Sequence, residues 1–146
     1  MITYEIFRQK DIDLIAPMYA SYFNLYEDAS WTVDTAKRRL KQLLFREDSV
    51  SLIQFKNNEI SGFSVGQLVQ FDDGLVFELI EIIVFKEFQG QELGSQLLMA
   101  IEEQAKLLGA FRIQLFAADD DLHNHFYNVK HSYKNATNNL WKTKTL

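Results

Sequence analysis

The strongest pattern along the chain is a long apolar run that leads through a glycine-bearing turn into an amphipathic stretch. The apolar run covers residues 75–85, and the turn follows as Gln89-Gly90-Gln91-Glu92-Leu93-Gly94. Beyond the turn, large apolar residues recur at helical spacing up to residue 101. This order predicts a buried strand, a tight turn and a helix over about 92–108.

The rest of the chain alternates between shorter strands and helices. Strands are predicted at 2–7, 50–55, 60–71, 112–117 and 140–145, and helices from Asp11, from Thr32 and from Asp121. This order mixes local hairpins with one strand–helix–strand crossover. It predicts an α/β fold with a mixed sheet, formed by a single domain over residues 1–146.

Turn-forming residues separate these elements. Asn57-Asn58 joins two strands as a hairpin, Asp72-Asp73-Gly74 leads into the central strand, and Gly109 ends the long helix. Gly62 and Gly66 lie inside a predicted strand, where glycine marks a bulge or a close approach of two backbones.

Composition narrows the function classes. The hydrophobic share of 47% and the aromatic share of 14% indicate a packed globule. The net charge of −5 argues against a nucleic-acid partner and favours cationic ones. No apolar run is long enough to cross a bilayer and no signal peptide is seen, so we expect no membrane partner and a cytoplasmic protein. The chain has no cysteine, which excludes disulfides, thiolate metal sites and a cysteine acyl-enzyme.

The turn before the long helix is a candidate anion site. The first N–H groups of a helix have no partner within the helix, and they lie at the positive end of its dipole. Gly90 and Gly94 would let a ligand approach the backbone closely. We therefore expect a phosphate-bearing ligand here.

These residues resemble the GNAT superfamily of N-acetyltransferases, which move an acetyl group from acetyl-CoA to an amine. The strand end Ile82-Ile83-Val84-Phe85-Lys86 is similar to the family's strand end, with Lys86 where proline is usual. Gln89 and Gly94 match the first and last positions of the family's pyrophosphate loop, whereas Glu92 replaces its middle glycine. The resemblance implies a mostly antiparallel sheet with flanking helices, splayed between the central strand and the following parallel strand.

The resemblance also implies how acetyl-CoA would bind, as a co-substrate without a metal. The strand end would pair with the pantetheine arm, and the loop would hold the pyrophosphate. The cofactor-binding residues so implied are Ile83, Val84, Phe85, Gln89, Gly90, Gln91, Glu92, Leu93, Gly94, Ser95, Asp120 and Tyr127.

A second motif, Asp120-Asp121-Leu122-His123-Asn124-His125-Phe126-Tyr127, resembles a stretch in which the family carries a tyrosine near the CoA sulfur. Asp120 replaces the family's asparagine and His123 its alanine. Tyr127 matches the tyrosine, which implies a general acid for the leaving thiolate. The alternative is a core aromatic, but helical spacing separates Tyr127 from Phe126, which favours a cleft-facing phenol.

Glu78 and Glu81 are the candidate bases, because a carboxylate on the central strand often accepts the amine proton in this family. Strand alternation puts the two on opposite faces, so only one would face the cleft unless the strand bulges. Either carboxylate could instead pair with a lysine or arginine, or lie on a solvated face.

The segment from residue 24 to residue 31 joins the first two helices, a region that borders the acceptor site in the family. Glu27, Asp28 and Trp31 could receive a primary amine of a small molecule or peptide, or could belong to a solvated loop with one buried tryptophan. His123 and His125 project from opposite sides of a helix, so we expect no metal site.

We expect an N-acetyltransferase that transfers the acetyl group directly within a ternary complex, and a homodimer is compatible with the sequence. Departures from the family pattern at Glu92, Asp120 and His123 keep open a non-catalytic module that binds CoA or another ligand in a regulatory or interaction role. A purely structural subunit of an assembly is the third alternative.

Overall fold

The computed structural model describes residues 1–136 and 140–146 of the chain. It divides into two compact units, residues 1–115 and residues 116–146, which we treat separately. The single domain predicted for residues 1–146 therefore stays a prediction. Within the described residues, no helix is both long and apolar enough to cross a membrane.

The first unit is built on a five-stranded sheet in the spatial order β1-β2-β3-β4-β5. The strands are β1 (Ile2–Glu5), β2 (Ser49–Lys56), β3 (Glu59–Phe71), β4 (Gly74–Val84) and β5 (Ala110–Gln114). All neighbours are antiparallel except β4 and β5, which are parallel. This confirms the predicted mixed, mostly antiparallel fold, although β5 begins earlier and ends earlier than the predicted 112–117.

The parallel pair separates halfway along β4. Pairing begins with Leu75 opposite Ala110 and ends with Glu78 opposite Gln114, whereas β4 continues to Val84. The second half of β4 therefore presents an edge that is not paired with β5, which is the predicted splay. Backbone groups along such an edge are available to an extended ligand.

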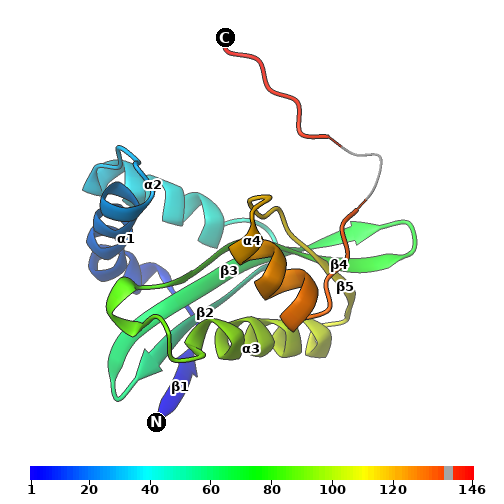
Figure 1. Ribbon diagram of the computed structural model, residues 1–146, viewed down its shortest axis with the longest axis horizontal. Helices are drawn as coiled ribbons and strands as arrows, with labels where there is room; N and C mark the ends of the chain where they lie inside the picture. Colours follow the sequence, from blue (N-terminus) through cyan, green and yellow to red (C-terminus); the bar gives the residue numbers. More distant parts are fainter. Residues whose placement is uncertain (137–139) are drawn as a thin grey trace. The chain divides into compact units, whose positions relative to one another are not determined.

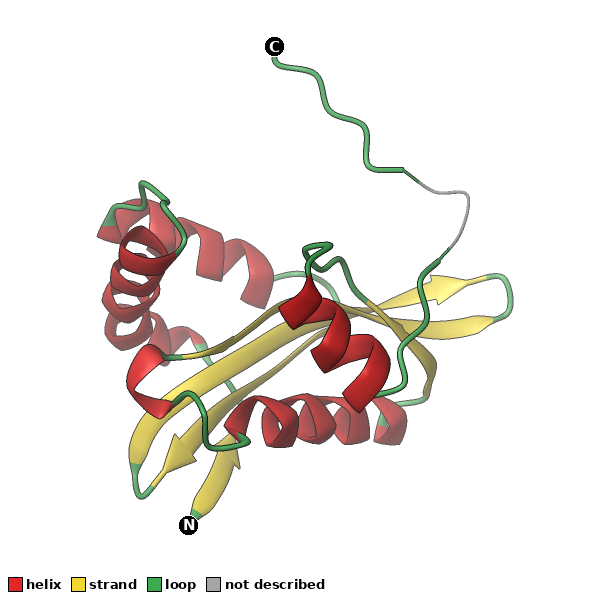
Figure 2. Ribbon diagram, in the orientation of Figure 1, coloured by secondary structure: helices red, strands yellow, loops and turns green. Residues whose placement is uncertain are grey.

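Helices cover both faces of the sheet in this unit (Figures 1 and 2). The helices α1 (Ile12–Tyr26) and α2 (Val33–Leu44) pack on one face, where Ile53 and Ile83 belong to the same buried cluster as Ile15 and Leu40. The helix α3 (Leu93–Leu107) lies on the other face (Figure 1). Short 3-10 turns, η1 (Gln9–Asp11) and η2 (Lys86–Phe88), precede α1 and α3.

The residues that precede the first two helices differ in whether they cap them. Thr32 caps α2: its hydroxyl accepts from the Thr35 N–H at 3.0 Å, and Thr35 reaches back to the Thr32 N–H. Asp11 precedes α1 as predicted, but its carboxylate accepts from the Arg8 N–H at 2.9 Å instead of capping α1.

Glycines in β3 allow two bulges, as predicted. The register shifts between Gln54 and Phe55, opposite Gly62, and again between Val65 and Gly66. A Cβ at Gly66 would overlap the Glu78 carbonyl oxygen and stand 2.5 Å from the Phe77 ring. The second bulge leaves Ile80 as an extra residue in β4.

The second unit contains α4 (Asp121–Asn124) and a wide turn, η3 (His125–Lys130), whose hydrogen bonds have π-helical spacing. The strand predicted at 140–145 is wrong, because residues 140–146 adopt no strand structure. A strand needs a neighbouring backbone to complete its hydrogen bonds, and alternation along one segment does not provide that neighbour.

Candidate active site

The loop that joins β4 to α3 holds two left-handed residues, with Gln91 between them. Gly90 has a φ of 78° and Glu92 a φ of 64°, and α3 begins at Leu93. Glycine tolerates this conformation far better than residues with a Cβ. The backbone at position 92 would therefore suit glycine better than the glutamate that this chain carries.

The helix start is open to an anion. Glu92 is the residue before α3, and its side chain forms no capping hydrogen bond there. The first N–H groups of α3 thus face the loop without a partner inside the helix. A Cβ at Gly90 would meet no atom within 4 Å, so the space beside that backbone is free. This arrangement fits a phosphate group.

Hydrogen bonds to three elements of the fold hold the exposed loop in place. Gln89 donates its amide to the Tyr22 hydroxyl and to the Val84 carbonyl, both at 2.9 Å. The Lys56 ammonium donates to the Gln91 side-chain oxygen. The loop is therefore tied to α1, to the end of β4 and to β2.

The residues of the strand end predicted to meet the pantetheine arm differ in how deeply they are buried. Ile83 and Phe85 are buried in the core against α1 and α2, whereas Val84 is half-buried. The Phe85 N–H donates to the Ser61 carbonyl at 2.9 Å. The Ile83 and Phe85 side chains therefore serve packing, and any contact with an extended ligand would come from the backbone edge.

Glu81 lies at the centre of a polar cluster between the sheet and both N-terminal helices. Its Oε1 accepts from the Tyr19 hydroxyl of α1 and from the Arg39 guanidinium of α2, each at 3.0 Å. Burial, and then the Glu81 charge, raise the pKa of the Tyr19 phenol. Burial opposes the charge on Arg39, but the hydrogen bond and charge of Glu81 outweigh it and raise the pKa of the guanidinium.

The bulge in β4 changes the relation between the two candidate bases. Glu81 is opposite Val65 and Glu78 is opposite Gln67. Val65 and Gln67 share a face of β3, and directly opposed residues share a face, so both glutamates project toward the α1 and α2 side. The expectation that they lie on opposite faces is wrong, because Ile80 is an extra residue between them. Glu78 accepts from the Gln114 amide at 2.9 Å.

The predicted acceptor residues differ in exposure. Glu27 and Asp28 are exposed, whereas Trp31 is half-buried and its ring makes an edge contact with Tyr19 at 5.3 Å between centroids. Asn24 holds this loop by bonding the Trp31 N–H and carbonyl, both at 2.7 Å. Trp31 is thus linked through Tyr19 to Glu81.

An open groove of about 400 Å³ lies between α1 and the segment that follows β4. Its lining includes Tyr22, which bonds Gln89, and Tyr26, whose ring lies 5.3 Å from the Lys86 ammonium. The groove therefore borders the loop on the side of α1.

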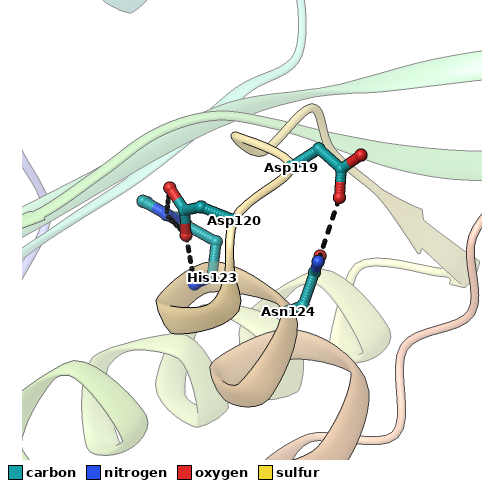
Figure 3. Close-up of polar contacts among 4 residues, drawn as sticks. All are labelled: Asp119, Asp120, His123 and Asn124. Carbon is teal, nitrogen blue, oxygen red and sulfur yellow. Dashed lines mark hydrogen bonds and ion pairs between the residues drawn. The ribbon is translucent and has the colours of Figure 1, made fainter.

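In the second unit, Asp120 caps α4 (Figure 3). Its carboxylate accepts from the His123 N–H at 2.8 Å and contacts the His123 Nδ1 at 2.7 Å, while Asn124 donates to Asp119 at 3.0 Å. The backbone hydrogen bond from His123, and then its side chain, lower the pKa of Asp120. Asp120 is thus engaged in capping, as its position before a helix suggests.

Tyr127 lies in the π-helical turn. Its ring contacts Tyr133 and Phe126, with centroids 5.5 and 5.0 Å apart, and burial raises the pKa of its phenol. The predicted separation of faces does not apply, because π-helical spacing differs from 3.6 residues per turn. Leu122 and Val129, which ordinary helical spacing would place on one face with Phe126, are 77% and 70% exposed.

Tyr19 and Arg39 are site residues that the sequence analysis missed. Along the sequence, Tyr19 fits an apolar position of the helix that starts near Asp11. Arg39 lies three residues after Ala36 and four before Leu43, both buried, so it is a charge on the apolar side of α2. A charge in that position, together with a carboxylate inside an apolar strand, was the available signal for an ion pair.

Solved structures and a family profile show which known proteins this chain is similar to. A search of curated proteins found no match. Among solved structures, a GNAT family acetyltransferase from Staphylococcus aureus is 20% identical, with a TM-score of 0.77 and 98% of each chain covered. An aminoglycoside N-acetyltransferase in complex with CoA is 11% identical, with a TM-score of 0.77 over 100% of this chain and 96% of that one.

A third similar structure is the ribosomal-protein-alanine N-acetyltransferase from Brucella melitensis biovar Abortus. It is 13% identical, with a TM-score of 0.72 over 100% of this chain and 98% of that one. Likeness at these identities shows the fold. The profile of the acetyltransferase (GNAT) family matches residues 14–131. With the splayed sheet and the left-handed loop before α3, this match establishes that the chain belongs to the GNAT acetyltransferase family.

Proposed function

We propose that the protein is an N-acetyltransferase that moves an acetyl group from acetyl-CoA to a primary amine of a small molecule or peptide, directly and within a ternary complex. The observation that carries the proposal is the left-handed loop at Gly90 and Glu92, placed between the splayed end of β4 and the open start of α3. Family membership supports the same reading.

The residues of the loop would hold the phosphates of acetyl-CoA, which supplies the acetyl group as a thioester. The N–H groups at the start of α3 are the donors, and the free space at Gly90 admits the phosphates to the backbone. The unpaired edge of β4 beyond Glu78 would bind the extended arm. Charge-assisted hydrogen bonds to such donors contribute roughly 1.5–3 kcal/mol each, so a few of them offset the unfavourable charge of Glu92.

We assign the general base to Glu78, acting through water. The Glu81 carboxylate is bonded by Arg39 and Tyr19, which suits a structural and orienting role, whereas Glu78 is bonded by the neutral Gln114 amide. An amine attacks only after losing a proton, and a carboxylate beside it provides the acceptor.

Paired substitutions test this assignment. Glu78→Gln is expected to lower kcat/KM for the amine by roughly 10²–10⁴-fold, the usual contribution of general base catalysis. Glu81→Gln keeps the shape of the cluster and is expected to lower mainly the free energy of unfolding. Steady-state kinetics and urea denaturation of both variants decide, and a reversal of the two effects would move the base to Glu81.

Tyr127 is proposed as the general acid that protonates the departing sulfur. The ordinary pKa of a phenol lies well above neutral pH and burial raises that of Tyr127 further, so the group is protonated and able to donate. Tyr127→Phe is expected to lower turnover by about 10²–10⁴-fold while changing the acetyl-CoA Kd little. If the variant keeps a kcat near that of the natural protein, Tyr127 serves packing instead.

Glu27 and Asp28 would attract a cationic acceptor toward the site, since both carboxylates are exposed. Such exposed attractions contribute only about 0.2–1 kcal/mol per pair, so they steer the amine without defining its identity. A panel of polyamines, aminoglycosides, amino acids and short peptides, assayed for release of the CoA thiol, is expected to identify a primary amine. Turnover of carboxylate-rich or hydroxyl acceptors alone would contradict the proposal.

Calorimetric titration with acetyl-CoA is the primary test of the whole proposal. Binding followed by thiol release with an amine is the expected result. Binding without release with any amine would support the non-catalytic alternative, and absence of binding at millimolar acetyl-CoA would overturn both.

A further inference from the structure

Gln54 of β2 is a fully buried amide, the largest buried polar side chain of that strand. Its neighbour Ile53 packs in the core beneath α1 and α2, so strand alternation turns Gln54 toward α3 on the opposite face (Figure 1). Burying an amide costs free energy unless its polar atoms are bonded. The partners of Gln54 therefore explain its presence there.

The amide of Gln54 is bonded at both ends. Its Nε2 donates to the Leu93 carbonyl at 3.0 Å and to the Tyr4 hydroxyl at 3.3 Å. Its Oε1 accepts from the Ser61 hydroxyl at 2.8 Å. Because a carbonyl only accepts, the bond to Leu93 requires the nitrogen on that side, which settles the orientation of the amide.

The first β-bulge builds this arrangement. Gln54 is opposite Gly62 and Phe55 is opposite Ile60, which leaves Ser61 as the extra residue of β3. The Ser61 hydroxyl donates to both the backbone and the side-chain oxygen of Gln54, at 3.1 and 2.8 Å. The bulge thereby locks the rotamer that reaches α3.

Leu93 is the first residue of α3, directly after the left-handed Glu92. Residues 89–92 are exposed, so the bonds that hold both ends of this loop matter for its position. Gln89 anchors the start of this loop through its bonds to Val84 and Tyr22. Gln54, a residue of the sheet, anchors the end of the loop through its bond to Leu93. The first turn of α3 is therefore tied to β2 by a buried side-chain bond, in addition to its apolar packing.

We propose that Gln54 is a positioning residue for the acetyl-CoA loop: by holding the Leu93 carbonyl, it fixes the first turn of α3 whose N–H groups bind phosphate. This inference rests on the proposed function of the loop. Gln54 does not touch the ligand, and it acts through the backbone of Leu93. Small displacements of a binding group weaken binding strongly, so the effect falls on acetyl-CoA affinity and not on the chemical step.

The test substitutes Gln54→Met, which keeps a long unbranched side chain and removes the donor to Leu93. The matched control is Ser51→Ala on the same strand, which removes a buried bond from the Ser51 hydroxyl to the Phe7 carbonyl at 3.0 Å and leaves α3 untouched. We expect Gln54→Met to raise the acetyl-CoA Kd about tenfold and to leave kcat at saturation within about twofold. We expect Ser51→Ala to keep the natural Kd within about twofold.

A second readout needs no ligand. Amide hydrogen exchange at residues 96–98, whose N–H groups make the first hydrogen bonds within α3, is expected to be faster in Gln54→Met and unchanged in Ser51→Ala. If Gln54→Met does not fold, Ser61→Ala serves instead, because it frees the Gln54 amide to rotate and is expected to raise the Kd by a smaller factor.

The outcomes separate the two proposals. If the natural protein does not bind acetyl-CoA, the proposed function fails. If it binds and the Gln54→Met variant binds equally well with unchanged exchange at residues 96–98, the positioning role fails and the proposed function stands. A rise in Kd that the Ser51→Ala control reproduces would also overturn the positioning role, because general destabilisation would then explain it.

Discussion

Glu92 shows how one residue can satisfy a fold at a local cost. A non-glycine residue in the left-handed region is strained, and here it stands at the entrance to α3. Its backbone keeps the loop geometry that glycine usually provides. Glu92 therefore places a charged side chain at a backbone position that suits glycine.

Replacing Glu92 separates strain from charge. Glu92→Gly and Glu92→Ala both remove the carboxylate, but only glycine relieves the left-handed strain. We expect the glycine variant to be more stable than the alanine variant by about 1 kcal/mol, measured by urea denaturation. We expect both to bind acetyl-CoA more tightly than the natural protein, because both remove a negative charge from the phosphate site. Equal stability of the two variants would mean that the loop relaxes out of the left-handed conformation.

Arg39 and Tyr19 owe their place in the site to a residue that is distant in the sequence. Tyr19 fits the pattern of its helix and Arg39 is a charge on the apolar side of α2, but each gains its role only beside Glu81. The carboxylate within β4 was identifiable from the sequence as unusual. Its partners come from residues 42 and 62 positions away, which no local pattern connects.

At the scale of elements, the bulge in β4 is the main determinant of the site. It rotates the strand so that Glu78 and Glu81 face the same side, and it lies where β4 and β5 separate. Gly66 makes the bulge possible, because any side chain there would overlap the Glu78 carbonyl and the Phe77 ring.

Two glycine substitutions test how strongly the bulge between β3 and β4 depends on Gly66. Gly66→Ala is expected to lower the free energy of unfolding by about 2–4 kcal/mol, because the new methyl group meets backbone that cannot move aside. Gly90→Ala is the matched control: it has open space around the Cβ and only the left-handed φ to oppose it, so about 1 kcal/mol is expected. Thermal and urea denaturation measure both. Similar losses of unfolding free energy at the two sites would show that β3 and β4 move apart readily to accept the methyl group.

At the scale of the whole molecule, the polar cluster around Glu81 ties both N-terminal helices to the sheet. The phenol of Tyr19 has a pKa above its ordinary value because of burial and the nearby Glu81 charge. Its protonated form is therefore favoured by folding. That stabilisation is fully present below the unfolded pKa of about 10 and is lost as the pH rises toward the folded pKa.

This predicts a specific alkaline sensitivity. Between about pH 10 and 11 the natural protein should lose stability more steeply than Tyr19→Phe, by up to about 1.4 kcal/mol per pH unit, the slope for one proton. Tyr127, whose pKa is also raised, titrates in both proteins and does not contribute to the difference. Urea denaturation at pH 8, 10 and 11 measures it. Parallel stability curves for the two proteins would show that Tyr19 ionises without consequence for folding.

The sequence by itself determined the order of the elements as far as the helix at Asp121, the turns at Asn57-Asn58 and Gly74, and the loop that precedes α3. These features depend on interactions within a few residues: periodic burial, turn chemistry and left-handed backbone. The family resemblance could be drawn for the same reason, since its motif is a local one. The structure bears out the mixed sheet and the splay.

Only the tertiary structure decided which side chains meet. It paired Glu81 with Arg39 and Tyr19, turned Glu78 to the same face through an extra residue in β4, and joined Gln54 to the first turn of α3. It also left residues 140–146 without the expected strand. Each outcome depends on contacts between segments distant in sequence, and an alternating or helical pattern says which face is buried without saying what it is buried against.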